Sequence, residues 1–281
     1  MENNTLDIIV CIKQVPMVSE LPWNAKTGTL KRELAQGMMD PASRLALEAG
    51  LRLQRTGQSE DRRIRVTALT MGPPMAEEVL HQAVSLGADH GVLLTDRKMA
   101  GADTNLTSFI LGRYIKMFKP DTGLVLCGSQ TSDSETAQVG PQLACELDFP
   151  AIGWASDIRL SQRSLIVTRL VDDFMETLEM DLPGLVTIDQ GAFVPRYAGL
   201  AGVARAFASP KIDVVDADRL ELDSDFNALE DSPTRILDVF SPATQKESRV
   251  LKGAAKTVVD QLFTDYGKII SSAMGKDLKK K

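Results

Sequence analysis

The sequence predicts an α/β fold in which a doubly wound, mostly parallel sheet is covered by helices on both faces. Short apolar runs alternate with helical patterns over the first 150 residues, the order of repeated strand–helix–strand units. The clearest run, Leu124 to Cys127, is apolar at every position, as expected of a parallel strand buried on both sides. Ligands of such sheets bind beyond the carboxyl ends of the strands.

The elements follow in order from residue 7. The alternation predicts strands at 7–12, 64–69, 91–95 and 124–127, helices at 41–56, 75–86 and 103–118, and a fourth helix that begins near Thr136 to Gln138. Pro41 suits the first turn of the first helix. Asp103 or Thr104 can cap the third helix, and Pro120 ends it. Prolines and glycines within 16–40 predict irregular structure there.

The pattern changes beyond residue 150. Residues 158–160 and 165–170 predict a hairpin, and 176–182 with 185–188 continue the sheet. After Arg196 come small residues, an acidic segment from Asp213 to Asp231, and an amphipathic helix near 253–272. We expect the core to need none of this last third. The chain then divides into domains 1–195 and 196–281, the second an appended subdomain or an arm for a partner.

Composition narrows the class of function. The 281 residues include 32 basic and 38 acidic side chains, a net charge of −6 that does not favour nucleic acid or anionic lipid. Cys11, Cys127 and Cys145 have neither disulfide nor zinc spacing, so we expect buried thiols and no metal site. We expect His81 and His90 at the surface. No apolar run approaches the roughly 20 residues of a membrane span, and we expect no signal peptide and a cytoplasmic location.

The strand ends predict one edge for a ligand. Those at 12–13, 71–72, 95–96 and 128–131 mostly carry Gly, Pro or small polar residues, which allow a close backbone approach. From Leu124 onward the order is strand, small-polar loop, helix, which directs free N–H groups and the positive end of a helix dipole at one place. One interpretation is an adenosine whose phosphates lie at the N–H groups of Ala137 to Gly140. The other is an ordinary helix capped by Ser134 or Thr136.

Six segments stand in a characteristic order: Cys11-Ile-Lys-Gln-Val15, Met39-Asp-Pro41, Met71-Gly-Pro73, Gly87-Ala-Asp-His-Gly91, Gly128 to Pro141, and Pro195-Arg-Tyr-Ala198. Together they resemble the beta subunit of electron-transfer flavoproteins over nearly the whole chain. The resemblance implies an adenine-nucleotide alpha-hydrolase-like fold and a heterodimer with an alpha subunit that carries a redox-active FAD. The beta subunit holds AMP in the housekeeping branch of that family. In the electron-bifurcating branch it holds a second FAD that accepts electrons from NADH.

Three segments resemble the bifurcating branch: Asp96 to Thr104, Asp133 to Gly140, and Ser232-Pro-Thr-Arg235. Arg97 offers a planar cation that could stabilise an anionic reduced flavin. Asp103 and Thr104 could hydrogen-bond the ring edge or the ribityl chain. The strand ends and the resemblance together assign these residues to the cofactor: Cys11, Lys13, Asp40, Met71, Gly72, Asp96, Arg97, Asp103, Thr104, Gly128, Gln130, Thr131, Asp133, Thr136, Ala137, Gln138, Val139 and Gly140.

The chain departs from the family pattern near the expected pyrophosphate. Asp40 replaces the usual Asn and removes an amide donor, and Ser129 replaces Lys or Arg and removes a positive charge. Ser134 and Glu135 stand where the bifurcating branch has Gly and Asp. Leu200 matches the leucine of the family loop that anchors partner dehydrogenases, with simple subunit packing as the alternative.

Three functions remain open. The first is a beta subunit that binds FAD and passes electrons between NADH or a dehydrogenase and the alpha-subunit FAD, by bifurcation. Its partners would be the alpha subunit, an acyl-CoA or hydroxy-acid dehydrogenase, NADH and ferredoxin. The second is an AMP-binding beta subunit in a housekeeping complex. The third is a non-redox nucleotide-binding module, for which residues 196–281 would have no use.

Overall fold

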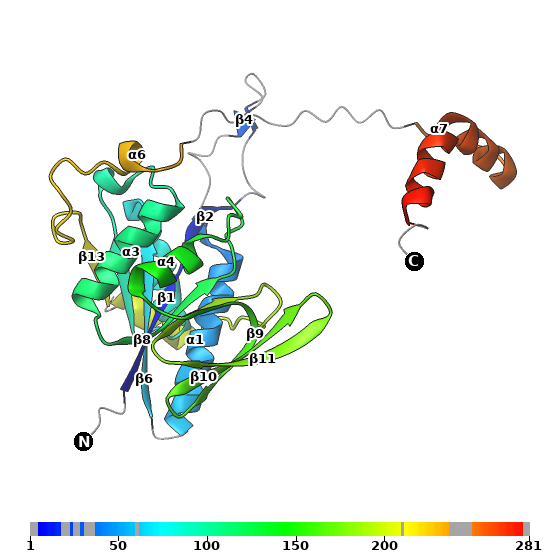
Figure 1. Cartoon of the computed structure of the whole chain (residues 1–281). Helices are drawn as coiled ribbons and strands as arrows, with labels where there is room; N and C mark the ends of the chain where they lie inside the picture. The colour runs from blue at the N-terminus through cyan, green and yellow to red at the C-terminus, as the bar shows by residue number, and fades with distance from the viewer. Residues whose placement is uncertain are drawn as a thin grey trace. The chain divides into compact units, whose positions relative to one another are not determined.

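The computed structural model describes residues 5–17, 23–24, 29–30, 37–59, 62–208, 211–235 and 249–277. The chain forms two compact units, Met1–Leu237 and Asp238–Lys281. The first contains the sheet and its helices, and the second contains helix α7 (Ala255–Asp277) (Figure 1). The helix predicted near 253–272 is therefore confirmed. Most of the stretch predicted to be irregular, 16–40, lies outside the described residues.

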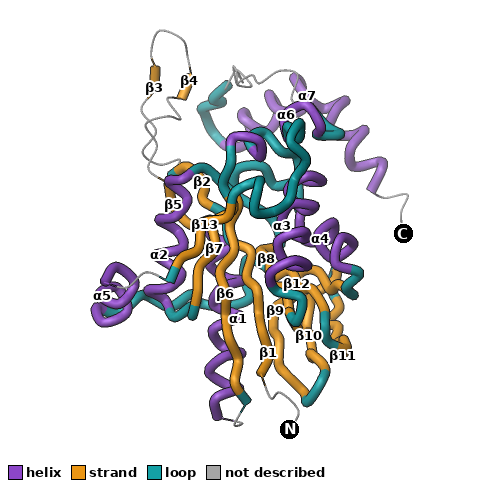
Figure 2. Tube along the Cα trace, turned by 90° about the vertical axis from the view of Figure 1, so that its left-hand side faces the viewer, coloured by secondary structure: helices purple, strands orange, loops and turns teal. Residues whose placement is uncertain are grey.

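One nine-stranded sheet runs in the order β11-β10-β9-β12-β8-β1-β6-β7-β13. Its strands are β1 (Thr5–Cys11), β6 (Arg63–Met71), β7 (His90–Leu94), β8 (Thr122–Gly128), β9 (Ala151–Ser161), β10 (Ser164–Val171), β11 (Phe174–Asp181), β12 (Gly184–Ile188) and β13 (Ile212–Val215). All neighbours from β9 to β13 are parallel, and β10 pairs antiparallel with both β9 and β11. Figure 2 shows these strands in orange, side by side. The predicted doubly wound, mostly parallel sheet is confirmed.

The strand order reverses between β1 and β8. From β1 the chain builds outward through β6 and β7, and then returns to place β8 on the other side of β1. The loops after these two central strands therefore leave in opposite directions and open a crevice at their carboxyl ends. Two short pairs, β2 (Gln14–Pro16) with β5 (Gly37–Met39) and β3 (Trp23–Asn24) with β4 (Thr29–Leu30), form between β1 and the first helix.

Helices cover both faces of the sheet. One face packs on α1 (Pro41–Ser59) and α2 (Glu77–Leu86), and the other on α3 (Thr104–Phe118) and α4 (Val139–Leu147). Because successive strand residues point to opposite faces, Ile8 and Val10 lie in the core under α1 and α2, whereas Ile9 lies in the core under α3 and α4. Both cores are apolar, which explains why the central strands show no polar alternation.

Short elements complete the first unit. They are the 3-10 turns η3 (Pro74–Ala76) and η4 (Arg97–Met99), and helices α5 (Leu200–Ala208) and α6 (Ala228–Asp231). Helix α5 packs on α2, which also contacts β13 at the edge of the sheet.

Strand 185–188 continues the sheet as predicted, and as β12 it lies between β9 and β8. One expectation about the end of the first unit is wrong. The core does need part of the chain after residue 196, because β13 pairs with β7, and Val215, Ala217, Leu220 and Leu222 are buried. A four-residue strand within an acidic stretch has too little periodicity to be recognised from the sequence.

Two expectations about single residues are also wrong. Cys145 is exposed, because α4 buries the face that carries Leu143, Ala144 and Leu147. His81 is half-buried: its ring stacks on Phe207 with centroids 4.9 Å apart.

The close approach of α4 to the sheet generates a test of the packing. A Cβ on Gly140 would lie 2.7 Å from Thr187 Cγ2, so Gly140→Ala should lower the unfolding free energy by about 1–2 kcal/mol in spite of the better helix propensity of Ala. Thr187→Ser in the same chain removes that methyl group but keeps the hydroxyl that accepts from Trp154 N, and should restore most of the loss. Urea unfolding measures both.

Gly199→Ala is the matched control, because nothing lies within 4 Å of its added Cβ. If Gly140→Ala were as mild as Gly199→Ala, the close packing of α4 on β12 would be contradicted.

Candidate functional site

An ion pair spans the crevice between β1 and β8. Lys13, just after β1, places Nζ 2.8 and 2.7 Å from the two carboxylate oxygens of Asp133, in the loop after β8. Partial burial alone would raise the pKa of Asp133, but hydrogen bonds from Lys13 and Thr131 outweigh it and hold the pKa below its usual value. The pair ties the two central loops together at the position where such sheets bind ligands.

A buried carboxylate fixes the same loop to α1. Asp40 is fully buried; one of its oxygens accepts from the backbone N–H groups of Ala42 and Ser43, at 2.9 and 3.3 Å. The other oxygen accepts from the backbone N–H and the hydroxyl of Ser132, both at 2.7 Å. Asp40 is thus both the cap of α1 and the anchor of the loop after β8.

The backbone before α4 is unusual. Glu135 and Ala137 have φ values of 51° and 55°, and Gln138, next in the chain, is right-handed. Residues of opposite hand in succession turn their N–H groups toward a common point, which is an anion-binding arrangement. Helix α4 begins at Val139, and no side chain among the described residues caps it. The sequence predicts that the helix begins near Thr136 to Gln138, and it begins one residue later, with Gln138 at the cap position. The predicted caps, Ser134 and Thr136, are wrong, since Ser134 bonds to Thr131 instead.

A buried hydroxyl at the end of β8 lacks a partner. Ser129 is 3% exposed, and its Oγ forms no hydrogen bond with the described residues. Gly128, just before it, is pressed against α1: a Cβ there would lie 2.7 Å from Ala42 Cβ. Unsatisfied buried polar atoms are rare and point to a water or a ligand. The free hydroxyl and the uncapped N–H groups of α4 are donors that suit the phosphates or ribose of a nucleotide.

The strand ends on the other side of β1 hold the C-terminal part of the first unit. Asp96 caps η4 through Lys98 N, and its second oxygen accepts from Ala217 N at 3.2 Å. Arg97 is exposed, and its guanidinium has no partner among the described residues. Thr104 Oγ1 donates to Gln138 Oε1 at 3.0 Å, so the start of α3 touches the start of α4.

Several predicted site residues turn their side chains away from this edge. Cys11 and Met71 pack against the core under α3 and α4. A hydrogen bond with Cys127, together with burial, raises the pKa of the Cys11 thiol well above its ordinary value. Asp103 caps α3 and bonds to Thr234. Of the remaining residues, Gly72 donates its N–H to Leu94 O, Gln130 is half-buried, and Thr136 is exposed.

A second arrangement, missed from the sequence, holds the loop after β12. Glu48, on α1 and 5% exposed, accepts from Arg196 Nε at 2.7 Å, from Arg196 N at 3.2 Å and from Arg52 Nε at 3.0 Å. Arg44 donates to Arg196 O and lies over the ring of Tyr197. In the sequence, the segment Pro195 to Ala198, which resembles the family pattern, is the signal that indicates a role for Arg196 and Tyr197.

This anchored loop presents apolar side chains to solvent. Val194 and Tyr197 are 82% and 87% exposed, and Leu200, the first residue of α5 directly after the loop, is 88% exposed. A backbone held rigidly while its apolar side chains point outward is typical of a surface that another protein covers.

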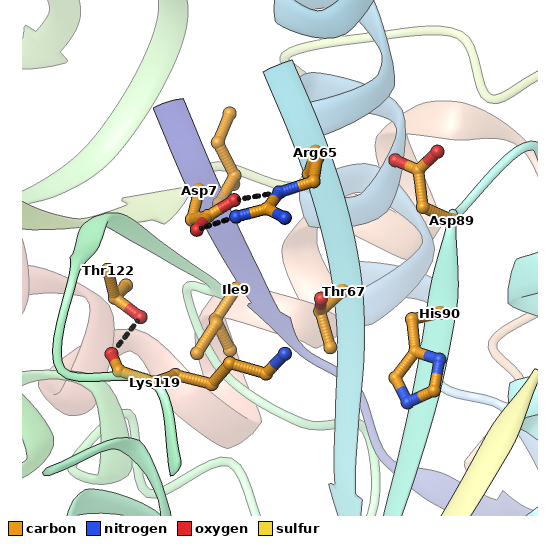
Figure 3. A pocket seen from close by; sticks show the side chains of 9 residues that line it. Asp7, Ile9, Arg65, Thr67, Asp89, His90, Lys119 and Thr122 are labelled. Atoms are coloured by element: carbon orange, nitrogen blue, oxygen red, sulfur yellow. Dashed lines mark hydrogen bonds and ion pairs between the residues drawn. The ribbon is translucent and has the colours of Figure 1, made fainter. Parts of the chain in front are cut away.

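A small hollow lies at the opposite edge of the sheet, at the amino ends of the strands (Figure 3). Its polar lining consists of Asp7, Arg65, Thr67, Asp89, His90, Lys119 and Thr122. Its volume of about 160 Å³ is well below the ~300–1,000 Å³ of small-molecule sites, and the Asp7–Arg65 ion pair occupies one wall. The hollow is therefore not the nucleotide site predicted at the carboxyl edge.

Two further findings concern the part of the chain that the structure describes. It contains no cluster of three or more His, Cys, Asp or Glu side chains that could hold a metal ion. None of its helices is both long and apolar enough to cross a membrane.

The fold is that of an open α/β sheet protein whose strand order reverses next to a polar crevice. The family model described as "Electron transfer flavoprotein domain" matches residues 27–220, and the chain therefore belongs to the electron-transfer flavoprotein family. It is 36% identical to an electron transfer flavoprotein subunit beta of Thermoanaerobacterium thermosaccharolyticum, over 92% of this chain and 96% of the relative.

The names of two more relatives each include a reductase. The caffeyl-CoA reductase-Etf complex subunit CarD of Acetobacterium woodii is 37% identical, over 88% of this chain and 92% of its own. The acryloyl-CoA reductase electron transfer subunit gamma of Anaerotignum propionicum is 35% identical, over 91% and 96%. The resemblance to electron-transfer flavoprotein beta subunits is thus confirmed.

The Glu48–Arg196 contact generates a pH-dependent prediction. Burial alone would raise the pKa of Glu48, but hydrogen bonds from Arg196 and Arg52 outweigh it and lower the pKa. Glu48→Gln should therefore cost about 2–4 kcal/mol of unfolding free energy at pH 7, as a broken buried ion pair does. Because the pKa of Glu48 is lower in the folded state, the ionised carboxylate stabilises the fold at pH values above its unfolded pKa of about 4.3. The difference in unfolding free energy between wild type and Glu48→Gln should therefore shrink as the pH falls below that value.

Urea unfolding at pH 7, 5 and 3.5 checks this expectation, with Glu78→Gln, an exposed carboxylate on α2, as the control. A difference between wild type and Glu48→Gln that stayed constant down to pH 3.5 would contradict the assignment.

Proposed function

We propose that this chain is the beta subunit of a heterodimeric electron-transfer flavoprotein and holds an adenine nucleotide at the switch point between β1 and β8. The observation that carries the proposal is the backbone from Ala137 to Gly140, where a residue of positive φ leads into a helix without a side-chain cap. The Ser129 hydroxyl, which follows β8 and has no hydrogen-bond partner within the described part of the chain, supports it. Contacts made through the backbone tolerate the loss of charged side chains, such as the Lys or Arg that Ser129 replaces.

FAD is the nucleotide that we favour, and AMP is the alternative. Relatives named as subunits of caffeyl-CoA reductase and acryloyl-CoA reductase complexes support a role in redox complexes. Arg97 supports FAD in particular, because an exposed guanidinium without a partner among the described residues can place its charge beside an anionic ring. When bound, the flavin supplies the electron chemistry, and the residues of this chain hold it and set the charge around it.

The electron partners would dock on two surfaces. The first surface comprises Val194 and Tyr197, on a loop that Glu48 and Arg44 anchor, and Leu200, the first residue of α5, all three of them exposed. We propose that a dehydrogenase binds there. In the second unit, α7 exposes Phe263 and Ile269, at 52% and 69%, and we propose that this arm covers the alpha subunit. Under this proposal, electrons pass between NADH or the dehydrogenase and the alpha-subunit FAD.

Nucleotide content tests the proposal. The full chain, purified natively and then denatured with acid, should release about one FAD per chain, identified by chromatography and by its visible spectrum. Thr136→Ala should weaken binding by only about 1 kcal/mol, because the backbone provides most of the contact.

Release of AMP would favour the alternative. If neither nucleotide were released, and neither bound when added to the purified chain, the proposal would be wrong.

Arg97 generates a second prediction. If its charge lies beside a flavin in this subunit, Arg97→Ala should slow NADH-dependent reduction of that flavin about tenfold or more, since a charged hydrogen bond is lost. The alpha-subunit flavin should remain bound. The matched control is Lys98→Ala, the neighbouring cation, and stopped-flow absorbance measures both. A rate unchanged by Arg97→Ala would assign this arginine to solvent.

A further inference from the structure

The first turn of α3 holds a segment that lies about 130 residues later in the chain. Asp103 Oδ1 accepts from Leu106 N at 3.0 Å and so caps the helix. Asp103 Oδ2 accepts from Thr234 N at 3.0 Å and from Thr234 Oγ1 at 2.8 Å. The backbone N–H of Asp103 donates to Ser232 Oγ at 2.9 Å. Asp103 thus accepts from Thr234 and donates to Ser232, two residues of the same segment.

The segment that Asp103 holds is ordered by its own contacts. Asn227 caps α6, and Ser232, 6% exposed, donates its hydroxyl to Ala228 O at 2.6 Å. Arg235 Nη2 donates a hydrogen bond to Glu230 O at 2.7 Å. Residues 227–235 thus form a small preformed piece, and α6 within it contacts η4. From Arg235 the chain continues toward the second unit, Asp238–Lys281.

The same turn of α3 also holds the start of α4. Thr104 Oγ1, next to Asp103, donates to Gln138 Oε1 at 3.0 Å. One turn later, Ser108 Oγ lies 3.1 Å from Val139 O, within hydrogen-bond distance. Gln138 and Val139 belong to the backbone that we propose binds phosphate. The first turn of α3 therefore contacts two segments. One is the start of α4, at the edge of the sheet where we propose that the nucleotide binds (the nucleotide edge), and the other is residues 232–234.

The Asp103 carboxylate has little capacity left for a ligand. Burial would raise the pKa of Asp103, but hydrogen bonds from Leu106, Thr234 and Asn105 outweigh burial and lower it, so the group stays ionised with its oxygens occupied. Both oxygens are needed in that arrangement. An amide in place of the carboxylate offers one accepting oxygen and loses either the helix cap or the Thr234 contact.

We infer that Asp103 is a positioning residue that couples the nucleotide edge to residues 232–235, and that it does so without contacting the nucleotide. This inference rests on the proposed function. A nucleotide that orders Ala137 to Gly140 also holds Gln138, hence Thr104 and the turn that carries Asp103. By linkage, whatever fixes residues 232–235 tightens nucleotide binding by the same factor. The kind of ligand concerned is an adenine nucleotide, and the segment concerned leads into the proposed partner-binding arm.

Hydrogen exchange followed by mass spectrometry on the full chain tests the coupling, with AMP and FAD as the added probes. In the wild type, saturating nucleotide should slow exchange in peptides that cover 137–142 and also in those that cover 228–235, by about fivefold or more. In Asp103→Asn the first effect should remain and the second should vanish, and the nucleotide should bind about fivefold more weakly.

Thr234→Val provides a second variant, because it removes one of the two donors at Asp103 Oδ2 while keeping the size of the side chain. It should show an intermediate loss of coupling. Asp172→Asn, an exposed carboxylate in the turn between β10 and β11, is the control and should behave as wild type.

The outcomes separate the inference from the proposed function. Protection of 137–142 without any change at 228–235 in the wild type would overturn the coupling and leave nucleotide binding intact. Coupling that persisted unchanged in both Asp103→Asn and Thr234→Val would overturn the role of Asp103. Absence of any nucleotide binding to the wild type would overturn the proposed function itself.

Discussion

The carboxyl edge of the sheet depends on aspartates that each join two segments distant in sequence. Asp40 fixes the loop after β8 to the start of α1, Asp96 fixes residue 217 to η4, Asp103 fixes residue 234 to α3, and Asp133 pairs with Lys13. Apart from the short β2–β5 pair, the described loops at this edge lie outside the regular strands of the sheet. A carboxylate has two oxygens and about four accepting positions, so it can satisfy one helix cap and one distant N–H together.

This arrangement also explains a departure from the family pattern. From the sequence, Asp40 looked like the loss of an amide donor near a pyrophosphate. In the structure it is fully buried and accepts four hydrogen bonds, two from Ser132. An Asn would have one accepting oxygen in place of two. Whatever binds at this edge meets the loop that Asp40 positions, and the negative charge itself is already satisfied by donors.

The first 150 residues could be predicted well because their signals are local. Continuous apolar strands, helical periodicity and the Asp103 cap each lie within a short window of sequence. What could not be predicted depends on distant partners. Strand β13 is defined by pairing with β7, the start of α4 by backbone of positive φ before it, and the Glu48–Arg196 contact by residues 148 positions apart. The segments that resemble the family indicated the carboxyl edge of the sheet as the site, but they did not indicate these contacts.

In the loop after β12, the residues that fix the backbone differ from those exposed to solvent. Arg44, Glu48 and Arg52, on successive turns of α1, fix the path of the backbone through contacts with Arg196 and with the rings of Tyr197 and Phe193. Val194 and Leu200 contribute almost nothing to those contacts, since more than four fifths of each side chain is in water. Mutations at these two positions can therefore accumulate during evolution at little cost to folding. Under the proposed function, a new specificity for an electron partner would arise there while the scaffold stays the same.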